Sequence, residues 1–237
     1  MDPKYAAQIL QKNITDYDQI APHFSTTRFH NWGEINKIVA QYVKPKQQIL
    51  DIGCGNGRLV KSLPTDIYYH GIDTSLALIE LARHQYSSST KHLSVIFQTG
   101  SILDIPSDYQ HFDLIFSIAV LHHIPSSLLR KQACREMYRV LKPNGFLIMT
   151  NWDLYQDKYM LYHNTNHTLD PQLDTNDTLI PWKDQTGKTI VSRYYHAYSM
   201  NELKDLLIAT GFHLIKNYMS KHNIITICQK GDEKFDL

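Results

Sequence analysis

Short apolar runs alternate with longer amphipathic segments through much of this chain, and turn residues separate them. The runs of strand length cover residues 48–52, 67–73, 94–98, 112–118 and 145–152. Several of them are followed by segments in which apolar residues recur at helical spacing. Such alternation predicts parallel strands in one sheet with helices on both faces. We therefore expect an α/β fold with a doubly wound, mostly parallel sheet.

The last part of the chain departs from this alternation. A capping box from Ser199 to Glu202 predicts the start of a helix, and Gly211 ends it. Apolar runs at 212–218 and 223–229 follow so closely that they predict an antiparallel hairpin. The expected sheet is seven-stranded and ends in this C-terminal hairpin.

Two segments fall outside the sheet pattern. Residues 3–12 predict a short helix, which with an aromatic stretch and a second helix forms an expected helical cap over residues 1–45. Residues 153–193 are polar with few apolar positions, so we expect an insertion over the active site that is partly mobile in the free protein. The whole chain, residues 1–237, is expected to form a single domain.

Composition sets limits on the function. The chain is 43% hydrophobic and 20% charged, and no apolar run reaches the length of a membrane span. The N-terminal residues lack a signal-peptide pattern, so we expect a cytoplasmic protein without a membrane partner. The three cysteines form no C-x-x-C pair, which speaks against a zinc site and a disulfide framework. A net charge of +1 does not by itself indicate a nucleic-acid binder, although a local basic patch fits within such a total.

Three glycines at every second position follow the first apolar run. The segment is Asp51-Ile52-Gly53-Cys54-Gly55-Asn56-Gly57. Glycine reaches backbone angles barred to other residues and lets a ligand lie against the main chain. We expect a helix over about 57–63, whose free N–H groups would favour an anionic ligand group. The dinucleotide fingerprint G-x-G-x-x-G needs its third glycine where Arg58 stands, so a dinucleotide-dependent dehydrogenase is disfavoured.

The spacing Asp-x-Gly-x-Gly-x-Gly resembles motif I of the class I S-adenosylmethionine (SAM) methyltransferases. This resemblance implies SAM as the cofactor, with the loop beneath its amino-acid end. Asp73 ends the second apolar run, where a carboxylate accepts hydrogen bonds from ribose hydroxyls, and Thr74 is a second contact. Ser101 stands where the family usually places an acid for the adenine amine, and the backbone of Ile102 is expected at the ring edge.

A narrower resemblance covers roughly residues 17 to 205. It rests on Tyr17-Asp18-x-Ile20-Ala21-x-His23-Phe24-Ser25-x-Thr27-Arg28, Ser117-Ile118-Ala119-Val120-x-His122-His123, Pro181-Trp182 and Arg193-Tyr194-Tyr195-His196. These segments are similar to those of the tRNA wobble-uridine carboxymethyl methyltransferases. The resemblance implies esterification of a carboxymethyl group on a modified wobble uridine, with the tRNA anticodon loop as partner. It also implies a small zinc-binding activator protein, as in the eukaryotic members, which carry a long basic insertion where this chain has residues 153–193.

Such a reaction needs alignment of two partners more than a general base, because a carboxylate is already ionised at neutral pH. Guanidinium groups suit a carboxylate or a phosphate. For His122 and His123 we expect that one packs and the other faces the crevice, and we expect no metal site. The candidate catalytic residues are Arg28, His122, Arg193, Tyr194 and His196. The candidate cofactor residues are Tyr17, Asp51, Gly53, Cys54, Gly55, Asn56, Gly57, Asp73, Thr74, Ser101, Ile102, Ser117 and Ile118.

Two other functions stay open at this point. The near-neutral net charge also suits a SAM-dependent methyltransferase of small metabolites. A third possibility is a non-catalytic module that binds SAM and serves a partner enzyme, which SAM binding without turnover would indicate.

Overall fold

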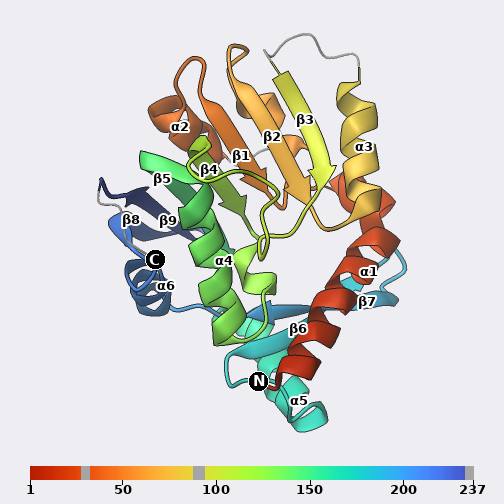
Figure 1. Ribbon diagram of the computed structural model, residues 1–237. Helices are drawn as coiled ribbons and strands as arrows, with labels where there is room; N and C mark the ends of the chain where they lie inside the picture. Colours follow the sequence, from red (N-terminus) through yellow and green to blue (C-terminus); the bar gives the residue numbers. More distant parts are fainter. Residues whose placement is uncertain (28–32, 88–93, 233–237) are drawn as a thin grey trace.

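The computed structural model describes residues 1–27, 33–87 and 94–232 of the chain (Figure 1). The helices are α1 (Pro3–Thr27), α2 (Gly33–Tyr42), η1 (Arg58–Ser62), α3 (Leu76–Tyr86), η2 (Leu121–His123), α4 (Ser127–Val140), α5 (Asp157–Leu169) and α6 (Met200–Ile208). The strands are β1 (Gln48–Ile52), β2 (Tyr68–Asp73), β3 (Ser94–Thr99), β4 (Phe112–Ile118), β5 (Leu141–Trp152), β6 (Asp177–Lys183), β7 (Thr189–His196), β8 (Phe212–Ser220) and β9 (Asn223–Lys230).

Seven strands form one sheet in the order β3-β2-β1-β4-β5-β9-β8. Strands β1 to β5 pair in parallel, whereas β9 runs antiparallel to both β5 and β8. This topology confirms the predicted mostly parallel sheet with a C-terminal hairpin. It also brings the carboxyl ends of β1, β2, β4 and β5 to the same side of the sheet, where ligands bind in open α/β folds.

Apolar side chains on both faces of the sheet hold the helices in place. Leu50 and Ile52 of β1 pack in a cluster with residues of α4 and α6, such as Met137 and Leu203. Ile49 points to the opposite face and packs in a second cluster with residues of α2, η1 and α3. Burial on both faces explains why the parallel strands are continuous apolar runs in the sequence.

The N-terminal helix is longer than the sequence predicts. We expected a helix over 3–12, but α1 continues to Thr27 with Pro22 inside it. Pro22 removes one hydrogen bond from α1. Contacts of the helix turns before and after Pro22 with the rest of the protein offset this loss. The ring of Tyr17 contacts that of His123, and the ring of Phe24 lies 5.9 Å from that of Trp182.

The helix expected over 57–63 is also different. It is the 3-10 helix η1, which begins after Gly57 in a left-handed conformation and ends at the extended residue Leu63. Five residues are too few for a helix dipole of any strength, so the expected N-terminal anion site is not formed there. By contrast, α3 has a side-chain cap, because Ser75 Oγ accepts a hydrogen bond from the Leu78 N–H group.

The polar segment 153–193 contains regular structure. It folds as α5 and a two-stranded antiparallel sheet of β6 and β7. The segment is tied to α1 near the N-terminus, since the Met1 ammonium group lies 2.9 Å from Asp174 and the Tyr5 hydroxyl donates to Asp170. In Figure 1, α1, β6 and β7 lie across the side of the sheet where β1, β2 and β4 end.

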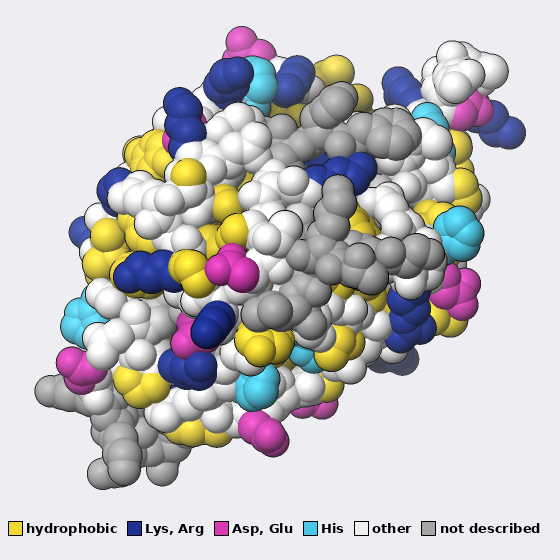
Figure 2. Space-filling model, turned by 90° about the horizontal axis from the view of Figure 1, so that it is seen from above, with side chains coloured by type: hydrophobic (Ala, Val, Ile, Leu, Met, Phe, Trp, Pro, Cys, Tyr) yellow, Lys and Arg dark blue, Asp and Glu magenta, His cyan; other side chains and the backbone are white. Residues whose placement is uncertain are grey.

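Charged side chains of both signs are mixed on the face of the molecule that Figure 2 shows. No helix in the described part of the chain has both the length and the apolar character needed to span a membrane. Figure 2 views the molecule from above, onto the amino ends of β1 to β3, and shows Lys and Arg interspersed with acidic and hydrophobic side chains. This mixture agrees with the net charge of +1.

Candidate active site

A cavity of about 1020 Å³ lies at the carboxyl ends of the central strands. Ile52, Asp73, Ile118 and Trp152, which end β1, β2, β4 and β5, all line it. Helix α1 and the segment 153–193 close its other sides. The cavity therefore has a part next to the glycine loop and a part next to β7, and both open into the same space.

The glycine loop fits a ligand that lies against the backbone. Gly53 has a φ of +65°, and a Cβ atom there would lie 2.4 Å from Val120 Cγ2. The N–H group of Gly55 donates to Asp73 Oδ2 at 2.9 Å, and the N–H group of Ser75 donates to Oδ1 at 2.9 Å. Burial raises the pKa of Asp73, although these backbone hydrogen bonds oppose the rise. The carboxylate is thus held firmly at the cavity wall and keeps acceptor capacity for hydroxyl groups.

Most of the candidate cofactor residues lie at the cavity. Those that line it are Tyr17, Gly53, Cys54, Gly55, Asn56, Asp73, Thr74, Ser101, Ile102 and Ile118. Asp51, Gly57 and Ser117 are not among the lining residues. Asp51 lies beneath the loop, where it accepts a hydrogen bond from the Tyr69 hydroxyl at 2.7 Å, and burial raises its pKa to about 7. Asp51 therefore supports the loop from below.

Two histidines and one arginine define the other part of the cavity. His122, His123 and Arg193 all line it, although we expected one histidine to pack away from the crevice. The two imidazole rings are 4.6 Å apart, and both contact Tyr195. The Arg193 guanidinium lies 5.2 Å from the centre of the same Tyr195 ring. Tyr195 therefore brings three nitrogen-bearing side chains together.

Aromatic rings form the wall beside these groups. Trp152 is stacked with Tyr195 at 5.2 Å and with Tyr159 at 6.2 Å. Lys158 lies over the Tyr159 ring and also lines the cavity. Sequence reasoning missed Lys158 and Tyr159, because no pattern in the polar segment distinguishes them.

The other candidate catalytic residues have different surroundings. Tyr194 is buried in a cluster with Ile9 and Leu173 and does not line the cavity. His196 also lies outside the cavity lining, and its ring bonds to Asp177 at 2.7 Å and to Glu202 at 2.8 Å. Arg28 lies outside the described residues.

Sequence reasoning gave no role to Asp18, although it is part of the segment that carries the resemblance. Its carboxylate accepts from Ser75 Oγ at 2.6 Å and from the Ala77 N–H group at 3.1 Å. These bonds dock α1 on the start of α3, next to Asp73. In residues 1–27, 33–87 and 94–232, no group of three or more His, Cys, Asp or Glu side chains is placed to hold a metal ion.

Comparison with known proteins agrees with this geometry. A family model described as a methyltransferase domain matches residues 50–149. A SAM-dependent methyltransferase from Methanosarcina mazei has a TM-score of 0.69 at 22% identity, over 83% of this chain and 98% of that one. Together with the glycine loop and Asp73, these findings define the chain as a SAM-dependent methyltransferase with the class I fold.

Two relatives have names that are more specific than that of the matching family. The tRNA (carboxymethyluridine(34)-5-O)-methyltransferase of Schizosaccharomyces pombe is 28% identical, over 91% of this chain and 94% of that protein. The protein of the same name from Arabidopsis thaliana is 36% identical, over 60% of this chain, but the match spans only 32% of that longer protein.

Proposed function

We propose that this methyltransferase transfers the methyl group of SAM to the carboxylate of a carboxymethyl group on a wobble uridine of tRNA. One observation carries the proposal. Arg193 is only 3% exposed, lines the same cavity as the glycine loop, and forms no ion pair with a carboxylate of the described chain. The carboxylate of Asp16 attracts the Arg193 charge but is itself paired with Lys12 at 2.5 Å. A buried charge without an ion pair of its own is costly, so such a site favours an anionic ligand.

The surroundings of Arg193 leave one donor of its guanidinium group without a partner in the described chain. Its Nη1 donates to the Tyr17 hydroxyl at 3.0 Å, and the rings of Tyr17, Trp182 and Tyr195 lie 4.8 to 5.6 Å from its Cζ. Its Nε is buried and has no hydrogen-bond partner among the described residues. An acceptor carboxylate would satisfy this donor and neutralise the charge.

His122 offers a second donor close by. Its Nδ1 accepts a hydrogen bond from the Trp152 N–H group at 3.2 Å, so the ring proton of the neutral form is on Nε2. Burial lowers the pKa of His122 well below its ordinary value, and the charge of nearby Arg193 adds to this effect. The buried Nε2 makes no hydrogen bond to the described chain. We propose that it donates to the second oxygen of the acceptor carboxylate or to the nucleobase of the acceptor.

The chemistry needs no proton transfer. SAM, when bound, supplies a methyl group on a positively charged sulfur. That methyl group would pass to a carboxylate oxygen of the acceptor, and the electron pair of the carbon–sulfur bond would return to sulfur. The role of Arg193 and His122 is to fix the carboxylate without blocking the attacking oxygen, and Asp73 and the glycine loop hold the other partner.

The names of the two tRNA-modifying relatives support the tRNA substrate, and the stacked aromatic wall suits a base that is splayed out of its strand. We also propose that residues 1–237 act as one methyltransferase domain, since α1 and the segment 153–193 contribute Tyr17 and Arg193 to the cavity. A tRNA substrate agrees with the cytoplasmic location that the sequence predicts. The small activator protein that the resemblance implies remains a prediction.

The test compares Arg193→Met with the wild type. Turnover is measured with isotopically labelled SAM on tRNA that carries carboxymethyluridine, and the product nucleoside is identified by mass spectrometry. The loss of hydrogen bonds to a charged group should reduce kcat/KM for tRNA by about ten- to a hundredfold or more. The Kd for SAM should change less than about twofold, because Arg193 lies in the other part of the cavity.

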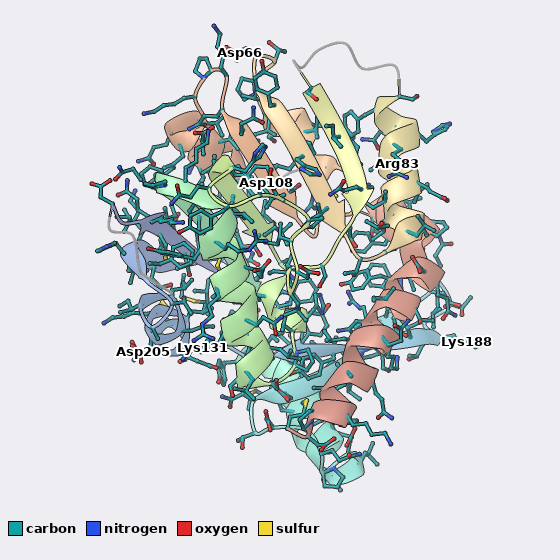
Figure 3. All side chains as sticks on the ribbon, in the orientation of Figure 1. Asp66, Arg83, Asp108, Lys131, Lys188 and Asp205 are labelled. Carbon is teal, nitrogen blue, oxygen red and sulfur yellow. The ribbon has the colours of Figure 1, made fainter. Side chains whose placement is uncertain are left out.

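A matched control is Arg83→Met on α3, where Arg83 Nε donates to the Phe97 carbonyl group away from the cavity (Figure 3). Its turnover should stay near that of the wild type. Unchanged turnover of Arg193→Met would contradict the carboxylate role. Methylation of small carboxylic acids in preference to tRNA would assign the enzyme to small metabolites, and SAM binding without turnover on either would assign it a non-catalytic role.

A further inference from the structure

A directed chain of hydrogen bonds holds Arg193. His123 Nδ1 lies 2.8 Å from the Tyr194 carbonyl oxygen, which can only accept, so Nδ1 carries the proton. Burial lowers the pKa of His123 to about 3, and Arg193 adds to this effect, so the ring is neutral and Nε2 is an acceptor. The Tyr17 hydroxyl, 2.9 Å away, must therefore donate to Nε2. Its oxygen is then left to accept from Arg193 Nη1.

This chain closes on the strand from which it starts. It runs from the Arg193 side chain on β7 through Tyr17 on α1 and His123 of η2 to the carbonyl group of Tyr194, the next residue of β7. Along this path each proton has one direction while His123 is neutral. The Arg193 guanidinium is therefore held through Nη1, and its Nε takes no part in this network.

We infer that Tyr17 and His123 are positioning residues that orient the Arg193 guanidinium toward the carboxylate of the methyl acceptor. This inference rests on the proposed function. It moves Tyr17 from the group of cofactor residues, to which the sequence assigned it, to the acceptor side of the cavity. It also gives a role to the second histidine of the His122-His123 pair, which acts on Arg193 through Tyr17.

The test is Tyr17→Phe, which keeps the ring contacts and removes only the hydroxyl. With its hydrogen bond lost, Arg193 should hold the acceptor less well, and kcat/KM for tRNA bearing carboxymethyluridine should fall roughly ten- to a hundredfold. The Kd for SAM should stay close to that of the wild type, whereas the melting temperature should fall by a few degrees, because His123 Nε2 and Arg193 Nη1 lose their partner. Tyr5→Phe is the matched control, since Tyr5 is on the same helix and bonds to Asp170 away from the cavity, and it should keep full turnover.

A double-mutant cycle separates action through Arg193 from an independent effect. If Tyr17 acts through Arg193, adding Tyr17→Phe to Arg193→Met should cause little further loss of turnover. Three results would overturn the inference. The first is a double variant in which the two losses multiply, and the second is a Tyr17→Phe variant with wild-type turnover. The third is SAM binding that weakens in proportion to the lost turnover. If Arg193→Met itself keeps full turnover, the proposed function fails instead, so the two failures are distinguishable.

Discussion

The sharpest prediction for the cofactor site concerns Asp73. Asp73→Asn keeps the shape of the side chain but removes its charge and one of its two acceptor oxygens. In the structure these oxygens accept from the Gly55 and Ser75 N–H groups, both at 2.9 Å, and they face the cavity. The amide NH₂ group of the variant must face one of these donors or the cofactor, so one favourable contact becomes unfavourable.

The expected magnitude follows from the bonds that are lost. A hydrogen bond to a charged group contributes about 1.5–3 kcal/mol, which corresponds to roughly ten- to a hundredfold in affinity for SAM. The variant should also melt at a lower temperature, because a backbone donor of the loop or of α3 loses its acceptor. Isothermal titration calorimetry with SAM measures the first effect, and thermal unfolding without ligand measures the second.

The control is Asp66→Asn, because Asp66 precedes β2 at the opposite end of the strand from Asp73 (Figure 3). This variant should bind SAM as the wild type does. SAM affinity of Asp73→Asn within about twofold of the wild type would refute the assignment of Asp73 to the cofactor. A lower melting temperature with unchanged affinity would limit Asp73 to a role in the loop.

Two further predictions concern the segment 153–193 and its attachment. Burial opposes a charge on His196, but hydrogen bonds to Asp177 and Glu202 raise its pKa above 6.5. Protonated His196 therefore stabilises the fold fully below pH 6.5, and this stabilisation is lost as pH rises through the raised pKa of the folded state. The melting temperature of the wild type should fall as pH rises from 6.5 through that pKa. The melting temperature of His196→Gln should not fall in the same way. Parallel profiles would contradict this. In hydrogen exchange, amides of β6 that pair with β7 should exchange slowly, whereas the polar composition of the segment predicts rapid exchange somewhere within 163–180. Fast exchange across β6 would show that this sheet does not persist in the free protein.

The sheet could be predicted from the sequence because each parallel strand is buried on both faces. Continuous apolar runs result, and β1 and β4 begin and end where the sequence predicts. The hairpin β6–β7 was missed because its strands mix polar and aromatic residues and pack mainly on α1, α5 and η2. The turn with Gly187 at a φ of +85° was the available signal.

The candidate site was predictable only in part, because residue type does not reveal a partner. The glycine loop and Asp73 could be predicted because their spacing in the sequence places both at the carboxyl ends of neighbouring strands. His196 and Arg193 are three positions apart in one motif, yet the first is bonded to two carboxylates and the second to none in the described chain. This difference depends on where Asp177 and Glu202 lie in space, which no local pattern contains.

The neighbouring residues Tyr17 and Asp18 have a consequence for engineering the enzyme. Tyr17 bonds to Arg193 on the acceptor side, whereas Asp18 bonds to the start of α3 on the cofactor side. One turn of α1 is thus a shared wall of both halves of the cavity. Substitutions that shift this turn will alter acceptor choice and cofactor affinity together, so a programme to retarget the enzyme should vary β7 and α5 and leave α1 untouched.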